Sequence, residues 1–61
     1  RLEAALAQLD PDEREAVTLK IFEQMTFREI AAIRGANQNT VASHYRRGLE
    51  KLRTRCAEEE R

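Results

Sequence analysis

The stretch TFREIAAIRGANQNTVASHYRR, residues 26–47, decides the fold of this chain because it predicts two helices joined by a tight turn. Thr26 and Glu29 have the spacing of a capping box, in which each side chain bonds the other residue's backbone N–H and a helix begins. Gly35 ends that helix, since glycine adopts the left-handed conformation common just past a helix terminus. Asn37 is then a good N-cap for a second helix. The stretch is therefore predicted to be a helix-turn-helix.

Two further helices are predicted before this motif. The first has apolar residues at three- and four-residue spacing and ends near Leu9. The second begins at Asp10, an N-cap followed by Pro11 and by Glu13, and runs to about Gln24. Apolar residues on several sides of it indicate a central helix touched on two flanks: Val17, Leu19, Ile21 and Phe22.

The same periodicity predicts which side chains of the motif form the core. Met25 and Phe27 are expected to pack across the helix junction. Ile30, Ala31 and Ile33 are predicted to form the inner face of the first motif helix. The last helix continues past the motif to about Arg55 with an apolar stripe at helical spacing: Val41, Tyr45, Leu49, Leu52 and Cys56.

Two residues depart from this pattern. Gly48 lies in mid-helix, where glycine costs about 1 kcal/mol relative to alanine, so we expect either a close helix approach or simple tolerance. Arg34 occupies a position before the turn that suits an apolar side chain. We expect its aliphatic stem to cover the core while its charge reaches solvent.

Length and composition restrict the remaining possibilities. With 61 residues the chain is expected to be one all-α domain, residues 1–61, with four helices and a long C-terminal recognition helix. Because it begins at Arg1, we expect it to be the C-terminal part of a longer protein. No apolar run suits a signal peptide or a membrane span, and the lone Cys56 can form neither an internal disulfide nor a cysteine zinc site. The expectation is a cytoplasmic domain without cofactor or metal.

The charge is distributed unevenly although the net charge is zero. Residues 1–36 carry five basic and seven acidic side chains, whereas residues 37–57 carry five basic side chains against Glu50 alone. The last four residues are three glutamates and one arginine. The second helix of the motif is thus locally basic, which favours nucleic-acid binding next to a helix-turn-helix turn.

The chain resembles region 4 of the sigma-70 family of RNA polymerase sigma factors, most of all the extracytoplasmic-function group. The resemblance covers about residues 2–55 and depends on the joint order of several short motifs. These are Leu6 and Leu9 ahead of Pro11, Arg14-Glu15, Glu29-Ile30-Ala31, Gly35, Thr40-Val41 and Leu49-Glu50-Lys51-Leu52-Arg53. Arg34 and Ala36 depart from it, since the family usually has larger apolar residues there, and so does Gly48, where alanine is usual.

The resemblance implies that the domain binds double-stranded promoter DNA at the −35 element and that another face docks on the β flap of core RNA polymerase. In this motif class the N-terminal part of the second helix points at base edges. The residues there carry side chains able to pair with adenine or guanine or to contact a thymine methyl group. The predicted base-contacting residues are Gln38, Asn39, Ala42, Ser43 and Arg46.

Phosphate contacts are expected from residues that flank this set: Arg28, Thr40, His44 and Arg47. The simpler interpretations are that Asn37 is only a helix cap, that Thr40 is a capping partner and that His44 is merely exposed. With no second histidine or cysteine pair, a catalytic or metal role for His44 is not indicated. Arg53 and Arg55 are expected to be solvated or to face a partner.

Three other functions are compatible with parts of this pattern. An enzyme is disfavoured because the chain has no phosphate loop, metal cluster or catalytic triad, nor room for a small-molecule pocket. A LuxR-type response-regulator domain shares the EIA-like and TV-like elements but normally has Lys-Leu-Gly after the recognition helix, whereas Arg53 follows Lys51-Leu52 here. A protein-interaction module that binds an anti-sigma factor is favoured slightly by the zero net charge and the acidic tail, and is compatible with DNA binding.

Overall fold

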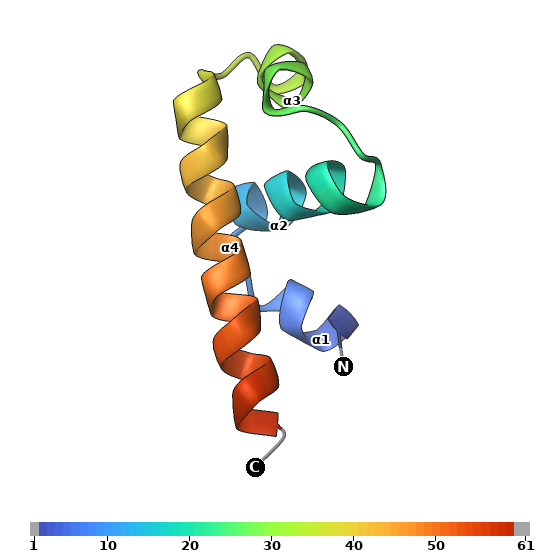
Figure 1. The fold of residues 1–61 in the computed structure, drawn as a ribbon, viewed down its shortest axis with the longest axis vertical. Coiled ribbons are helices and arrows are strands. Elements are labelled where there is room, and N and C mark those ends of the chain that lie inside the picture. The colour runs from blue at the N-terminus through green and yellow to red at the C-terminus, as the bar shows by residue number, and fades with distance from the viewer. Residues whose placement is uncertain (1, 60–61) are drawn as a thin grey trace.

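The computed structural model describes the backbone of residues 2–59 and the side chains of residues 3–54. Its helical elements are α1 (Leu2–Ala7), α2 (Pro11–Val17), the π-helical segment η1 (Thr18–Phe22), α3 (Phe27–Arg34) and α4 (Gln38–Glu59). Figure 1 shows α4 along the whole length of the molecule, with α1, α2 and α3 on one side of it. The predicted all-α fold, four α-helices with a helix-turn-helix and a long last helix, is confirmed.

The local signals that start and stop the motif helices are present. The Glu29 backbone N–H donates to Thr26 Oγ1 at 3.1 Å, and the Thr26 N–H donates to Glu29 Oε1 at 2.8 Å. Gly35 has φ +63°, and the Ala36 N–H donates to the Ala31 carbonyl at 2.9 Å to close the turn. The predicted capping box and glycine stop are therefore confirmed.

The second predicted helix reaches Phe22, close to its predicted end near Gln24, but it is not α-helical throughout. Its α-helical part stops at Val17 and continues as a π-helical turn, in which the Glu23 N–H donates to the Thr18 carbonyl at 3.3 Å. Each π-turn holds about one residue more than an α-turn, so the side chains that follow rotate away from the α-helical face. As a result Phe22 is 55% exposed and Ile21 is also exposed, although both were predicted to pack.

The core lies where α2, α3 and α4 meet. Its buried members are Ala16, Ile30, Ala31 and Val41, and the half-buried Leu19, Met25, Phe27 and Tyr45 pack against them. The Phe27 and Tyr45 rings meet edge to face, 5.3 Å between centroids, and Lys20 Nζ lies 4.8 Å from the centre of the Phe27 ring. The predictions that Tyr45 is a core residue and that Met25 and Phe27 pack at the junction are confirmed.

The predicted inner face of α3 is wrong for one residue. Ile30 is fully buried, but Ile33 is 64% exposed. Phe27, Ile30, Ala31 and position 34 follow the i, i+3, i+4, i+7 spacing of one helix face, and Ile33 lies off that stripe. The inner face therefore ends in Arg34 rather than in an apolar side chain.

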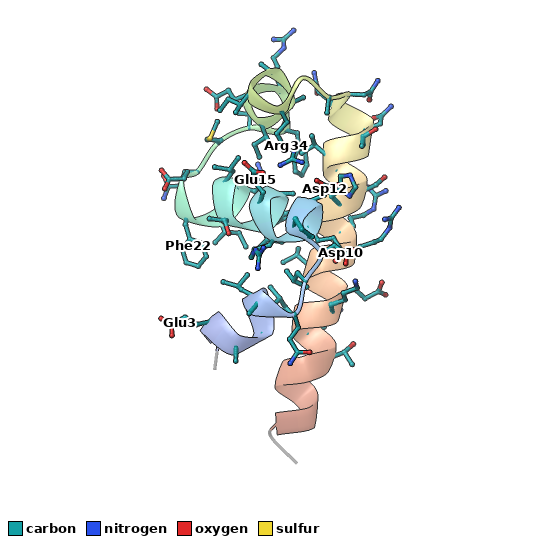
Figure 2. The ribbon with its side chains drawn as sticks, turned by 180° about the vertical axis from the view of Figure 1, so that it is seen from behind. Glu3, Asp10, Asp12, Glu15, Phe22 and Arg34 are labelled. Atoms are coloured by element: carbon teal, nitrogen blue, oxygen red, sulfur yellow. The ribbon has the colours of Figure 1, made fainter. Side chains whose placement is uncertain are left out.

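Arg34 does not lift its charge into solvent as predicted. One guanidinium nitrogen, Nη1, donates to Glu15 Oε1, and another, Nη2, donates to Asp12 Oδ1. Both carboxylates belong to α2 and lie three residues apart, hence on one face of that helix. Figure 2 shows Arg34 reaching from α3 toward Glu15 and Asp12.

Close contact between α2 and α4 explains Gly48. A β-carbon at this position would lie 2.7 Å from Val17 Cγ2 and 3.3 Å from the Glu13 carbonyl oxygen. The close helix approach suggested by the sequence is confirmed. Further along α4, Leu49 and Leu52 are half-buried as the stripe predicted, whereas Cys56 lies outside the described side chains.

Candidate nucleic-acid interface

The N-terminal end of α4 is capped by Asn37 and its first turn is exposed. The Asn39 backbone N–H donates to Asn37 Oδ1 at 2.6 Å, which confirms Asn37 as an N-cap. Gln38, Asn39 and Thr40, the first turn of α4, are all exposed. Their polar side chains stand at the positive end of a 22-residue helix, where backbone N–H groups and the helix dipole favour an anion.

The predicted base-contacting residues lie off the inward stripe of α4, with Gln38, Asn39 and Arg46 exposed and with Ala42 and Ser43 half-buried. Val41, Tyr45, Gly48 and Leu52 form the inward stripe of α4, and helical periodicity places Ala42, Ser43 and Arg46 off that stripe. Arg46 is exposed, and its Nη2 lies 3.5 Å from Ser43 Oγ one turn earlier. The structure therefore brings these side chains together on one continuous surface with the exposed first turn.

The predicted phosphate-contacting residues are not all on this surface. Thr40 and Arg47 are exposed on α4, and Arg28 is exposed in the first turn of α3. His44 is half-buried and turned toward α2, with its Nε2 4.0 Å from Asp12 Oδ2. A phosphate contact by His44 would therefore share the imidazole with this carboxylate.

A shallow groove extends the candidate surface along α4. It is lined by Ser43, Arg46, Arg47, Leu49, Glu50 and Arg53, so three arginines surround one glutamate. This groove was not predicted from the sequence, in which Arg53 is expected to be solvated or to face a partner rather than to lie with Arg46. The i, i+4, i+7 spacing of Arg46, Glu50 and Arg53 is the signal that could have indicated it.

An ion pair between the half-exposed Lys51 and the buried Glu13 joins α4 to α2. Lys51 Nζ donates to Glu13 Oε1 at 2.8 Å, and the Asp10 backbone N–H donates to the same oxygen at 3.2 Å. The hydrogen bond from Lys51 is the main reason why the pKa of Glu13 is lowered, although burial opposes it. The same bond raises the pKa of Lys51. Glu13 thus fixes α4 to the start of α2 by an interaction that needs both charges.

The described residues contain no arrangement suited to a metal ion. Residues 3–54 hold no group of three or more His, Cys, Asp or Glu side chains placed to bind one. Within residues 2–59 no helix has the length and apolar character needed to cross a membrane.

Comparison with known proteins identifies the family. The family model described as Sigma-70, region 4 matches residues 1–52. The chain belongs to the sigma-70 region 4 family. It is also 49% identical over 49 residues to the RNA polymerase sigma factor CarQ of Myxococcus xanthus, a match that covers 80% of this chain and 28% of CarQ. The chain thus spans less than a third of that relative, and no solved structure matches it.

Proposed function

We propose that this sigma-70 region 4 domain binds promoter DNA in a sequence-specific manner, at the −35 element, as part of a sigma factor in transcription initiation. The observation that carries the proposal is the exposed face of α4, where polar and basic side chains run from the capped first turn to Arg46 and Arg47. A capped helix N-terminus with such a face is what major-groove recognition requires.

Each residue on this surface has a proposed role. Gln38, Asn39 and Arg46 bond base edges, and Ala42 and Ser43 contact neighbouring bases. Thr40, Arg47 and Arg28 bind phosphates and set the register of the helix. His44 remains a proposed phosphate contact, and the nearby Asp12 carboxylate competes with the phosphate for its imidazole.

A second face fits the polymerase itself. Ile21 and Phe22 are exposed apolar side chains at the end of η1. Figure 2 shows Phe22 on the side of the molecule remote from α4. Exposed apolar side chains that gather on one turn are typical of protein contacts. We assign this turn to the β flap of core RNA polymerase, so that polymerase and DNA contact opposite parts of the domain.

The domain acts without catalysis or cofactor in this proposal, and in the cytoplasm, where polymerase and promoter DNA are found. The family match decides against a LuxR-type response-regulator domain. The alternative of a module that binds an anti-sigma factor instead of DNA keeps one supporting observation, the zero net charge of the chain.

Salt-dependent binding separates these functions. The full-length protein in complex with core polymerase is titrated with a promoter duplex at several salt concentrations. A DNA reader loses affinity steeply as salt rises, and Arg47→Ala makes the slope of log affinity against log salt shallower by about one. Arg14→Ala, which removes an exposed arginine on α2, is the matched control and leaves the slope unchanged. Undetectable DNA affinity at low salt, together with tight binding of an anti-sigma protein, would establish the interaction module instead.

A further inference from the structure

Arg34 links α3 to α2 at the end of α3, just before the turn that leads into the recognition helix α4. It is the last residue of α3, and only residues 35–37 separate it from α4. Its side chain is 25% exposed, and two of its guanidinium nitrogens each bond a different carboxylate of α2. A planar guanidinium held at two points fixes orientation as well as distance, which a lysine ammonium cannot do.

One carboxylate of this clamp, that of Asp12, also faces α4. Asp12 Oδ1 accepts a hydrogen bond from Arg34, and Asp12 Oδ2 lies 4.0 Å from His44 Nε2. Asp12 therefore lies between the end of α3 and the second turn of α4. An acidic group from α2 thus adjoins both helices of the motif.

The last turn of α3 has little apolar packing to hold it in place. The buried residues of α3 are Ile30 and Ala31, both at least three positions before the helix end, and Ile33 is exposed. The last inward position of α3 is Arg34, which has carboxylate partners where an apolar side chain would have packed. Orientation at this end depends on charge pairing.

We propose that Arg34 is a positioning residue for DNA binding: its clamp on Asp12 and Glu15 holds the end of α3, and with it the turn that leads into α4, against α2, so that the first turn of α4 can enter the major groove, without touching DNA itself. The inference rests on the proposed promoter binding. Because Asp12 and Glu15 are about half exposed, the clamp contributes little to the free energy of unfolding. Its loss should instead change the placement of α4.

The test measures DNA affinity of variants of the full-length protein bound to core polymerase. The probe is a duplex selected from a randomised pool by the wild-type complex. Arg34→Gln is expected to lower affinity about three- to tenfold at a temperature where circular dichroism shows both proteins folded. Arg34→Lys, which keeps the charge but loses the fork, is expected to be intermediate. Glu15→Gln, on α2, should reproduce part of the loss, and serves as the test if Arg34→Gln does not fold.

A charge swap decides between positioning and direct contact. Because Asp12 also faces position 34, the swap is made together with Asp12→Asn in both proteins compared. In that background Glu15→Arg with Arg34→Glu restores a charge pair between α2 and α3 and should recover affinity relative to Arg34→Glu alone. If Arg34 bound a phosphate directly, the glutamate would repel DNA and the swap would not recover binding. Unchanged affinity in Arg34→Gln, or absence of recovery in the swap, would overturn the proposal. If instead the wild-type complex enriches no sequence from the pool, promoter binding itself fails, which is a different result.

Discussion

Among the side chains that the structure describes, Glu13 is the most fully buried acidic one, with 2% of its surface exposed. One of its oxygens accepts hydrogen bonds from Lys51 of α4 and from the Asp10 backbone at the start of α2. A single carboxylate thus caps one helix and ties it to another. We expect Glu13→Gln to lower Tm at neutral pH by roughly 5 °C, because the amide keeps the shape but loses the charge, as thermal unfolding would show.

The pH dependence of stability follows from the same residue. Its pKa in the folded protein lies below the ordinary value of about 4.5, mainly because of the Lys51 hydrogen bond. Its contribution to stability is therefore present above that ordinary value and is lost as pH falls through the folded pKa. Between about pH 6 and about pH 3, wild-type Tm should fall more steeply than that of Glu13→Gln. Parallel curves would contradict this assignment.

Gly48 and Gly35 make a matched pair for testing two different glycine requirements. Alanine at position 48 gains helix propensity but places a methyl group 2.7 Å from Val17 Cγ2, so we expect a net loss of about 1–3 kcal/mol in the free energy of unfolding. Alanine at position 35 meets no atom within 4 Å and should cost about 1 kcal/mol, from the positive φ alone. Denaturant unfolding measures both. Adding Val17→Ala should relieve the loss at position 48 but not that at position 35.

Whether the sequence could predict a side-chain interaction depends on how far apart its two residues lie along the chain. The Thr26–Glu29 box, the Gly35 stop and the Asn37 cap are interactions within a few residues, and all are found. The partners of Arg34 lie 19 and 22 residues away and that of Lys51 lies 38 away. Such pairs depend on how the helices cross, which a pattern of apolar residues does not specify.

Among the elements, η1 differs most from what the sequence predicted. A π-turn and an α-turn differ by about one residue, and a segment of five residues is too short for periodicity to separate them. Gln24 then adopts φ 57°, which turns the chain toward α3. The consequence is a turn that presents Ile21 and Phe22 outward instead of burying them.

If the exposed turn of η1 contacts polymerase, removing its largest apolar side chain should weaken that contact. Because Phe22 is exposed, Phe22→Ser should change Tm by less than about 2 °C while weakening binding of the full-length protein to core polymerase. Ile33→Ser, which removes a similarly exposed apolar side chain from α3, is the control and should leave polymerase binding unchanged. Equal effects of the two variants in a pull-down with purified core polymerase would contradict the assignment.

At the scale of the whole molecule, the distribution of charge matters more than its sum. The net charge is zero, yet Arg46, Arg47 and Arg53 line one groove on α4. Helical spacing made the outer face of α4 predictable, since the inward stripe leaves only one side free. The structure added the continuity of the groove and the turning of His44 toward Asp12, because both depend on contacts that single residues do not reveal.

The most direct test of promoter reading by α4 is the base preference of Arg46→Ala. Wild-type and variant complexes with core polymerase are each used to select duplexes from a randomised pool, with Arg14→Ala as control. Promoter reading predicts that Arg46→Ala loses discrimination at one base pair, worth about 1–3 kcal/mol, and keeps the rest of the preferred sequence. An unchanged preference, or a uniform loss of affinity for all sequences, would contradict base recognition by this helix.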